Sequence, residues 1–235
     1  TAAGVRQIDS WHYRQRIFSF FGRVNYDYKS KYLLSLVLRR DGYSKLPKDN
    51  RWGTFPGISA GWVLSRENFM ESCSNVLSYA KIRASYGANG NVSGVLDANG
   101  NVVTGLDYYT VQGSYGIMKD KDGKIVPNYN GKVPLMINDL PNPTMRWEKS
   151  YTFETGFDIG FLNNKYILNF TYYNRRTQDK FAEITLPSHS GVSSFLSNNG
   201  EVQNQGMELE LTANVLRTKD WKFTVSMNTA YNKNK

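Results

Sequence analysis

Apolar and polar residues alternate with a period of two through the stretch 18–62, which predicts consecutive β-strands. In the first part of this stretch, one face carries Phe18, Phe20, Val24, Tyr26 and Tyr28, and the other carries Ser19, Arg23, Asn25 and Asp27. After a short polar turn the alternation resumes, with Tyr32, Leu34, Leu36 and Leu38 opposed to Ser35, Arg39 and Asp41. Each strand is therefore expected to separate an apolar environment from a hydrated one.

The same alternation recurs along the chain and predicts eight strands. Their expected ranges are about 16–27, 32–41, 54–64, 79–87, 146–159, 165–175, 206–215 and from 221 onward. Full charges lie near the centres of the polar faces, at positions such as Arg23, Glu154, Glu208 and Glu210. A polar face with charges is also found on soluble sheets, so this feature alone does not identify the surroundings.

The lengths of the connections alternate along the chain. Those at 28–31, 161–164 and 216–220 are short, and those at 42–53, 88–145 and 177–205 are long, while the intermediate connector 65–78 falls on the short side. Antiparallel strands place alternate connections at opposite ends of the sheet. One end is therefore expected to carry short turns and the other long loops. This arrangement is typical of outer-membrane barrels.

The predicted fold is therefore all-β, a transmembrane antiparallel β-barrel segment. Residues 1–235 are expected to form part of one barrel domain, with 88–145 and 177–205 as long extracellular loops. The insertion 88–145 carries two hairpin signals, Asn99-Gly100 and Asp122-Gly123. The alternative fold is a soluble extracellular β-sandwich, either a glycan-binding module or a hydrolase.

Eight strands can close a narrow barrel, but the termini favour a larger one. With the short turns in the periplasm, both ends of the chain would lie outside, whereas a complete bacterial barrel has both in the periplasm. The chain is thus expected to be a segment of a larger barrel. It opens with TAAGVRQ and no signal peptide, as a mature product or a fragment would.

The amino-acid composition excludes some classes of function and of site. Aromatic residues make up 14% of the chain, and aromatics favour strands and membrane interfaces. The net charge is +9, but Lys and Arg are spread along the chain without a recognition motif, so no nucleic-acid partner is expected. Cys73 is the only cysteine, which excludes an internal disulfide and a cysteine metal cluster.

Several long runs resemble a known family. These are FGRVNYDYKSKYLL, LRRDGYSK, NRWGTFPGISAGWVLSRENFM, KIRASYGANGN, NPTMRWEKSYTFETGFDIGFLNNKYILNFTYYNRRTQDKF and NNGEVQNQGMELEL. They are similar, in order, to barrel motifs of SusC/RagA-type TonB-dependent transporters of Bacteroidetes. The resemblance covers about residues 18–235, except for the loop at about 92–137.

The resemblance implies a 22-stranded barrel in the outer membrane, surrounded by lipid, with an internal plug and energy supplied through TonB in the periplasm. It further implies a SusD-like surface lipoprotein as partner and a dimer of such pairs. The plug, the TonB-contacting segment and the closing strand have no counterpart in this chain. The expected function is import of a large nutrient, an oligosaccharide or a peptide, without enzymatic activity.

Motifs that could carry chemistry have simpler explanations. The G-x-S-x-G run at Gly57–Gly61 lies inside an alternating strand rather than in a strand–turn–helix elbow, and His189 is the only histidine after it. Asp97 and Asp120 each begin a short run of Asp, Asn and Gly residues, but neither run is followed by the glutamate that an EF-hand requires. A Ca²⁺ site of another type in the loop 97–123 is a minor alternative. No other cofactor is expected. His12 and His189 are too isolated for a zinc site. The carboxylate pairs Glu154/Asp158 and Glu208/Glu210 are expected to line a hydrated lumen and pair with neighbouring cations rather than to act as a glycosidase pair.

Loops and inward-facing cations are the candidate binding residues. The long insertion holds Tyr108, Tyr109, Tyr115 and Tyr129 among Gly, Asn and Asp residues, a setting suited to stacking on sugars or gripping peptides. The same residues would also suit a loop that packs on itself or on a partner. On the strands, Arg39, Arg83 and Arg175 are expected to point inward and, together with Lys81, to favour an anionic solute slightly.

Overall fold

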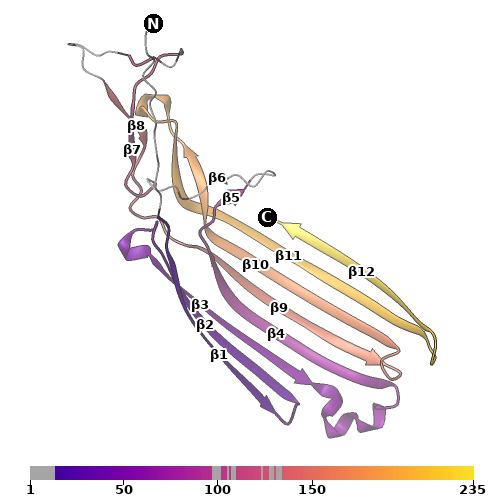
Figure 1. The fold of residues 1–235 in the computed structure, drawn as a ribbon. Coiled ribbons are helices and arrows are strands. Elements are labelled where there is room, and N and C mark those ends of the chain that lie inside the picture. The colour runs from indigo at the N-terminus through magenta and orange to yellow at the C-terminus, as the bar shows by residue number, and fades with distance from the viewer. Residues whose placement is uncertain are drawn as a thin grey trace.

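The computed structural model describes residues 14–96, 102–104, 106, 110–122, 124–126, 130 and 134–235 of the 235-residue chain. Its main feature is one antiparallel sheet of eight long strands, in the order β1-β2-β3-β4-β9-β10-β11-β12 (Figure 1). Because β1 and β12 are its edges, this sheet is open rather than closed on itself. No helix in the described residues is long and apolar enough to cross a membrane.

All eight predicted strands are confirmed. They are β1 (Ile17–Tyr28), β2 (Tyr32–Tyr43), β3 (Trp52–Val63), β4 (Leu77–Asn91), β9 (Glu148–Phe161), β10 (Tyr166–Thr185), β11 (Ser194–Arg217) and β12 (Lys222–Asn234). Each strand follows its neighbour in the sequence, so the sheet is a meander into which residues between β4 and β9 are inserted. Short 3₁₀ helices lie in the first long connection and in the connector that follows β3: η1 (Lys48–Asn50), η2 (Leu64–Arg66) and η3 (Asn68–Cys73).

The pairing register keeps the alternation in phase across the whole sheet. Leu36 lies opposite Val24 on one side and Ile58 on the other, and Phe170 lies between Phe157 and Leu209. The apolar residues therefore form a continuous surface, here called the outer face, and the polar ones form the inner face. The outer face is open, with Phe18 59% and Met227 58% exposed, which requires an apolar solvent or a partner to cover it.

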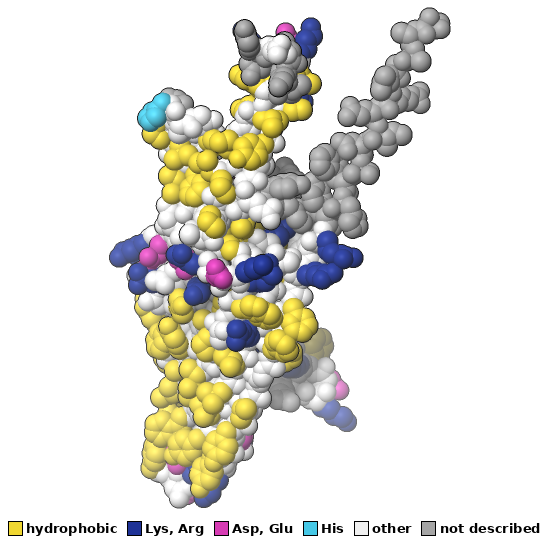
Figure 2. All heavy atoms as spheres, turned by 90° about the vertical axis from the view of Figure 1, so that its left-hand side faces the viewer, with side chains coloured by type: hydrophobic (Ala, Val, Ile, Leu, Met, Phe, Trp, Pro, Cys, Tyr) yellow, Lys and Arg dark blue, Asp and Glu magenta, His cyan; other side chains and the backbone are white. Residues whose placement is uncertain are grey.

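Aromatic residues mark the two limits of the outer face. At the short-turn end, the ring of Tyr32 stacks between Tyr28 and Trp62, with centroids 6.3 Å apart in each pair. At the other end, Phe18 and Phe20 contact Trp52. Ten residues of strand at about 3.3 Å each, tilted by about 40°, cover about 25 Å, the height of the apolar band of a membrane barrel. Figure 2 shows hydrophobic side chains at the height of the long strands, below a band of charged ones.

The insertion between β4 and β9 contains two small hairpins. Strands β5 (Val95–Leu96) and β6 (Val102–Thr104) pair on either side of the predicted Asn99-Gly100 turn, whose tip lies outside the described residues. Strands β7 (Ser114–Ile117) and β8 (Leu135–Asp139) pair with each other and rise at the loop end, at the height that the β10–β11 hairpin reaches (Figure 1). Between them, a bridge joins Lys119 to Ile125 across the second predicted turn, in agreement with a hairpin there.

The segment 177–205, predicted as a long loop, is mostly an extension of the two strands that flank it. Strand β10 continues to Thr185 and β11 begins at Ser194, so only the residues between them, with η5 (Ser188–Ser190), leave the sheet. The register shifts near Thr177 and Lys180 break the simple alternation. The period-two signal is lost at such irregularities, although the strands continue.

A compact core lies at the loop end of the sheet. It consists of the buried residues Tyr43, Leu46, Phe55, Leu106, Met145, Trp147 and Phe181. Met145 is completely buried, and the Trp147 ring packs edge-on against Phe55 at 5.5 Å. These residues come from β2, β3 and the connection between them, from the insertion and from β10, so the core packs the loops against the wall.

Candidate functional site

The inner face carries grooves lined by hydroxyl, amide and charged side chains. One groove crosses β1 to β9 and includes Asn25, Asp27, Ser35, Ser59, Lys81, Arg83, Ser85 and Glu154. A second one, over β9 to β12, includes Asp158, Asn169, Thr171, Glu208, Glu210 and Asn228. Both signs of charge are present, so this surface can hold water and bind polar solutes of mixed charge.

Arg83 links three strands of the inner face. Its Nη2 donates a hydrogen bond to Thr171 Oγ1 at 2.5 Å, and its Nε lies 3.4 Å from Asp158 Oδ1. Arg83 pairs in register with Gly156, which lies between Arg83 and Thr171, and the absence of a side chain at 156 leaves room for the guanidinium group to cross β9. The expectation that inward carboxylates pair with neighbouring cations is confirmed for Asp158.

The other predicted cations lie on the sheet as well. Arg39, on β2, forms an ion pair with the buried Asp41 at 2.7 Å. Arg175, on β10, donates from Nε to Thr152 Oγ1 at 3.3 Å. Because Arg39 and Arg83 both have carboxylate partners, the inner face is less cationic than a count of its basic residues indicates.

The predicted tyrosines are only partly placed. Tyr115 lies on β7 and is 73% exposed, so it faces solvent on the β7–β8 hairpin. Tyr108, Tyr109 and Tyr129 lie outside the described residues. The structure therefore does not bring these four tyrosines together into one described site.

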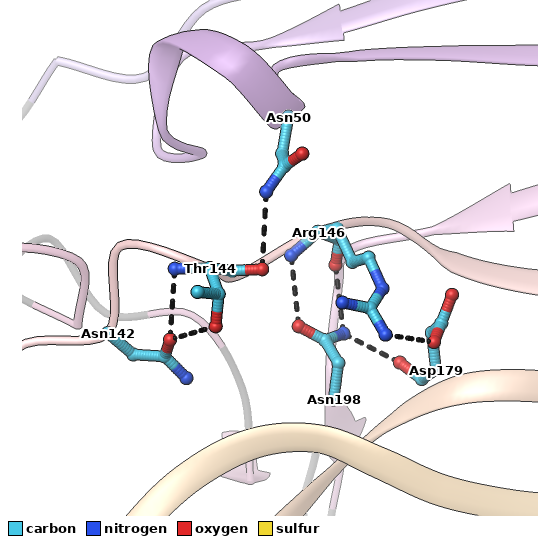
Figure 3. Close-up of polar contacts among 6 residues, drawn as sticks. All are labelled: Asn50, Asn142, Thr144, Arg146, Asp179 and Asn198. Atoms are coloured by element: carbon cyan, nitrogen blue, oxygen red, sulfur yellow. Dashed lines mark hydrogen bonds and ion pairs between the residues drawn. The ribbon is translucent and has the colours of Figure 1, made fainter.

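A network of amides ties the insertion to the β10–β11 hairpin (Figure 3). Asn198 Oδ1 accepts a hydrogen bond from the Arg146 backbone N–H at 2.9 Å, and its Nδ2 donates to the carbonyls of Arg146 and Asp179. Asn142 caps its own turn by accepting hydrogen bonds from the Thr144 N–H and hydroxyl, at 3.0 and 2.6 Å. The Asn142 amide also donates to the Leu196 carbonyl at 2.8 Å, so both asparagines join the same two segments.

Charged groups strengthen this junction. Arg146 Nη2 lies 2.6 Å from Asp179 Oδ1, and this hydrogen bond raises the pKa of Arg146 above its usual value. The carboxylate of Glu148 is buried and accepts hydrogen bonds from the Phe181 N–H and from Asn91 Nδ2, both at 2.7 Å. A buried carboxylate with two donors is compensated and holds both partners in place. The insertion and the β10–β11 hairpin are thus joined into one structural unit at the loop end, here called the platform.

This junction was not predicted from the sequence. Asn142, Asn198 and Glu148 gave no local signal beyond the Asn-Pro-Thr turn sequence at 142–144. Their partners in other segments lie 19 to 57 residues away along the chain. Only the pairing of β9, β10 and β11 brings these segments together.

The structure places two of the motifs that were considered for catalysis or metal binding. Gly57 to Gly61 lies entirely within β3, without the turn and helix that a nucleophile elbow needs. Asp120 Oδ1 accepts hydrogen bonds from the N–H groups of Asp122 and Lys124 in the hairpin turn. Within the described residues, no group of three or more His, Cys, Asp or Glu side chains is placed to hold a metal ion.

Comparison with known proteins identifies a matching family and several similar proteins. The profile of the family described as "TonB dependent receptor-like, beta-barrel" matches residues 2–235. TonB-dependent receptor P3 of Formosa agariphila is 34% identical over 99% of the chain, and TonB-dependent receptor SusC of Bacteroides thetaiotaomicron is 32% identical over 99%. The chain spans 22% of the length of each of these relatives.

Solved structures show the same architecture. The structure titled "RagAB peptide importer in the 'open-open' state" superposes with a TM-score of 0.77 at 26% identity, over 94% of this chain and 22% of that one. The "closed-closed" state of RagAB superposes with a TM-score of 0.75 at the same identity. The eight-stranded sheet therefore corresponds to part of the wall of a much larger barrel in those structures.

Proposed function

Because this chain belongs to the TonB-dependent receptor-like β-barrel family, we propose that it forms part of the wall of an outer-membrane importer for large nutrients. The observation that carries the proposal is the division of one sheet into an open apolar outer face and a hydrated inner face of mixed charge. Lipid covers the outer face, and solutes cross beside the inner one. The short turns lie in the periplasm, and the platform at the loop end faces the cell exterior.

The proposed energy source and partner follow from the relatives. Transport draws on TonB through a part of the protein that lies outside these strands. A SusD-like surface lipoprotein binds at the loop end, where the insertion and the β10–β11 hairpin form a firm platform, and such pairs assemble as dimers. The exposed β7–β8 hairpin, with Tyr115 and Leu135 both at least 70% exposed, supports a protein contact at this end.

The proposed substrate is an oligosaccharide or a peptide. The pairing of Arg39 with Asp41 and of Arg83 with Asp158 weakens the expectation of an anionic solute, because these cations are already compensated. The similarity to a peptide importer supports testing peptides alongside glycans. Tyr108, Tyr109, Tyr115 and Tyr129 of the insertion, with Arg39, Arg83 and Arg175, remain the proposed substrate contacts.

Uptake by intact cells tests the proposal. Cells with and without the gene would be supplied with labelled oligosaccharides and labelled peptides, each with TonB present or absent. We expect one class to accumulate only when both the gene and TonB are present. Equal accumulation in all four strains for every substrate class would overturn the proposal.

Deletion of residues 92–133 tests the role of the insertion separately from that of the barrel strands. We expect loss of substrate uptake or of lipoprotein association, with the barrel still assembled in the membrane. Replacement of Lys121 by Gln, an exposed change at the second hairpin, is the control. Unchanged uptake and association after the deletion would remove the insertion from the proposed site.

A further inference from the structure

The outer face has a trough among its large side chains. Along one register row, Leu34 pairs with Ala60, and Ala60 pairs with Ala84. The rows on either side carry large residues: Tyr32, Trp62 and Ile82 on one, and Leu36, Ile58 and Tyr86 on the other. The hollow over the two alanines is bordered by the outer-face residues Tyr26, Tyr32, Leu34, Trp62 and Ile82, and Leu33, Gly61 and Arg83 also contribute to its lining.

Cations stand at the short-turn boundary, one register row beyond the alanines and past Tyr32 and Trp62. Lys29 Nζ lies 5.3 Å from the centre of the Tyr28 ring, and Tyr28 belongs to the outer face. Arg66 Nη1 donates to the Ser30 carbonyl at 3.2 Å, which keeps a second cation beside the same turn. Two acidic groups lie nearby, and both have partners: Glu67 is engaged by Lys31 at 3.0 Å and by the Trp62 indole N–H at 3.1 Å, and Asp27 accepts from the Ser30 N–H.

The turn itself holds Lys29 in an unusual conformation. Lys29 and Ser30 have φ angles of 53° and 52°, in the left-handed region that favours Gly and Asn. The turn is closed by the Lys31 N–H to the Tyr28 carbonyl at 3.0 Å, and Asp27 Oδ1 accepts from the Ser30 N–H at 2.6 Å. A fixed turn therefore presents the lysine at the boundary between the apolar band and water.

We propose that the outer face of β1–β4 binds one anionic phospholipid. Its acyl chain runs from the short-turn boundary past Tyr32 and Trp62 into the hollow over Ala60 and Ala84. Its headgroup phosphate contacts Lys29 and Arg66 at the short-turn boundary, and Tyr28, Tyr32 and Trp62 surround the glycerol region. This site requires only that the outer face contacts lipid, and it is independent of the transported substrate.

The chain contains a matched control for the charge. Lys165 Nζ lies over the Tyr166 ring at 5.8 Å in another short turn, so it repeats the lysine–tyrosine arrangement. The outer face beside it carries Ile159, Leu168 and Leu211 in register, with large side chains where the trough has alanines. Lys29→Gln and Lys165→Gln thus remove the same charge, but only the first lies beside the trough.

Native mass spectrometry of the protein purified in mild detergent tests the site. The protein would be exchanged into nanodiscs of equal phosphatidylglycerol and phosphatidylcholine, and the retained lipid would be identified after release. We expect a phosphatidylglycerol molecule to remain bound, and Lys29→Gln to lower its preference over phosphatidylcholine about fivefold, the effect of one lysine near an anionic headgroup. Lys165→Gln is expected to leave the preference unchanged.

The double variant Ala60→Leu with Ala84→Leu fills the trough and is expected to abolish retention of both lipids. Ala213→Leu, another addition to the outer face, on β11, is expected to have no effect. Equal losses from Lys29→Gln and Lys165→Gln would indicate only general attraction to an anionic surface and would overturn the site. Unchanged retention in the trough variant, or no retained lipid in the unmodified protein, would overturn it as well.

Discussion

At the scale of single residues, Gly156 shows how the inner face is built. A Cβ atom at this position would collide with the Phe170 carbonyl oxygen and lie 3.2 Å from Arg83 Nη2. We expect Gly156→Ala to displace the Arg83 guanidinium from Thr171 and to lower the free energy of unfolding by about 1–3 kcal/mol, the usual cost of overpacking. Urea unfolding of the detergent-solubilised protein measures this change.

Gly22→Ala is the control for this substitution. A Cβ atom at Gly22 meets no heavy atom within 4 Å, and the residue lies on a strand of the same sheet. We expect its stability to match that of the unmodified protein. Equal effects of the two substitutions would show that the close approach at Gly156 has no energetic consequence.

Glu67 is expected to make the stability of the folded protein depend on pH. Hydrogen bonds from the Trp62 indole and from Lys31 lower the pKa of Glu67 below its usual value. A carboxyl whose pKa falls on folding stabilises the folded state above its unfolded pKa of about 4.3, and this contribution is lost as the pH falls through the lower folded-state pKa. We therefore expect Glu67→Gln to lower the melting temperature at pH 7 and to match the unmodified protein near pH 3.

The control for this prediction is Glu71→Gln, in the same connector, at a side chain for which the structure gives no ion pair. Melting curves of the three proteins between pH 7 and pH 3 provide the comparison. A difference between Glu67→Gln and the unmodified protein that stays constant with pH would contradict the assignment of Glu67 as the titrating group.

At the scale of elements, Asn198 joins the β10–β11 hairpin to the segment that leads into β9. Its side chain makes three hydrogen bonds to backbone groups of Arg146 and Asp179. We expect Asn198→Ala to leave these groups unpaired, to cost about 1–3 kcal/mol locally, and to speed proteolysis of the insertion 88–145. The strands of the wall, which do not depend on this junction, should remain resistant.

Limited proteolysis followed by mass spectrometry locates the cuts. Asn204→Ala, on the same strand nearer the membrane band, is the matched control and should leave the cleavage pattern unchanged. Cleavage of Asn198→Ala at the same sites and rates as the unmodified protein would show that the platform does not rely on this side chain.

The elements also show what the sequence could predict. A strand with one apolar and one polar face repeats every two residues, so β1, β2, β9 and β12 could be recognised locally, and tight turns such as 28–31 followed from short polar gaps. The extension of β10 to Thr185 could not be recognised, because the register shifts near Thr177 interrupt the alternation. The junction at Asn142 and Asn198 could not be predicted either, because a single asparagine in a sequence does not indicate a hydrogen-bond partner more than 50 residues away.

At the scale of the whole molecule, the open apolar face is the property that needs a physical explanation. Side chains such as Phe20, Leu38 and Tyr231 are each more than half exposed and lie in one continuous surface. A water-soluble domain rarely leaves so large an apolar surface uncovered, whereas lipid covers it without a partner. The inner face, with Arg83, Glu154 and Glu208, requires water on the opposite side of the same sheet.

Cysteine labelling across the wall tests this division most directly. Single cysteines would replace Leu36 and Phe170 on the outer face, and Ser35 and Thr171 on the inner face, in a Cys73→Ser background of the protein assembled in its native outer membrane. Each would be treated with a charged, water-soluble maleimide and with a lipid-soluble one. We predict that the outer positions react only with the lipid-soluble reagent and that the inner positions react with the charged one. Reaction of Leu36→Cys and Phe170→Cys with the charged reagent, as fast as that of the inner positions, would contradict the account of this sheet as the wall of a membrane barrel.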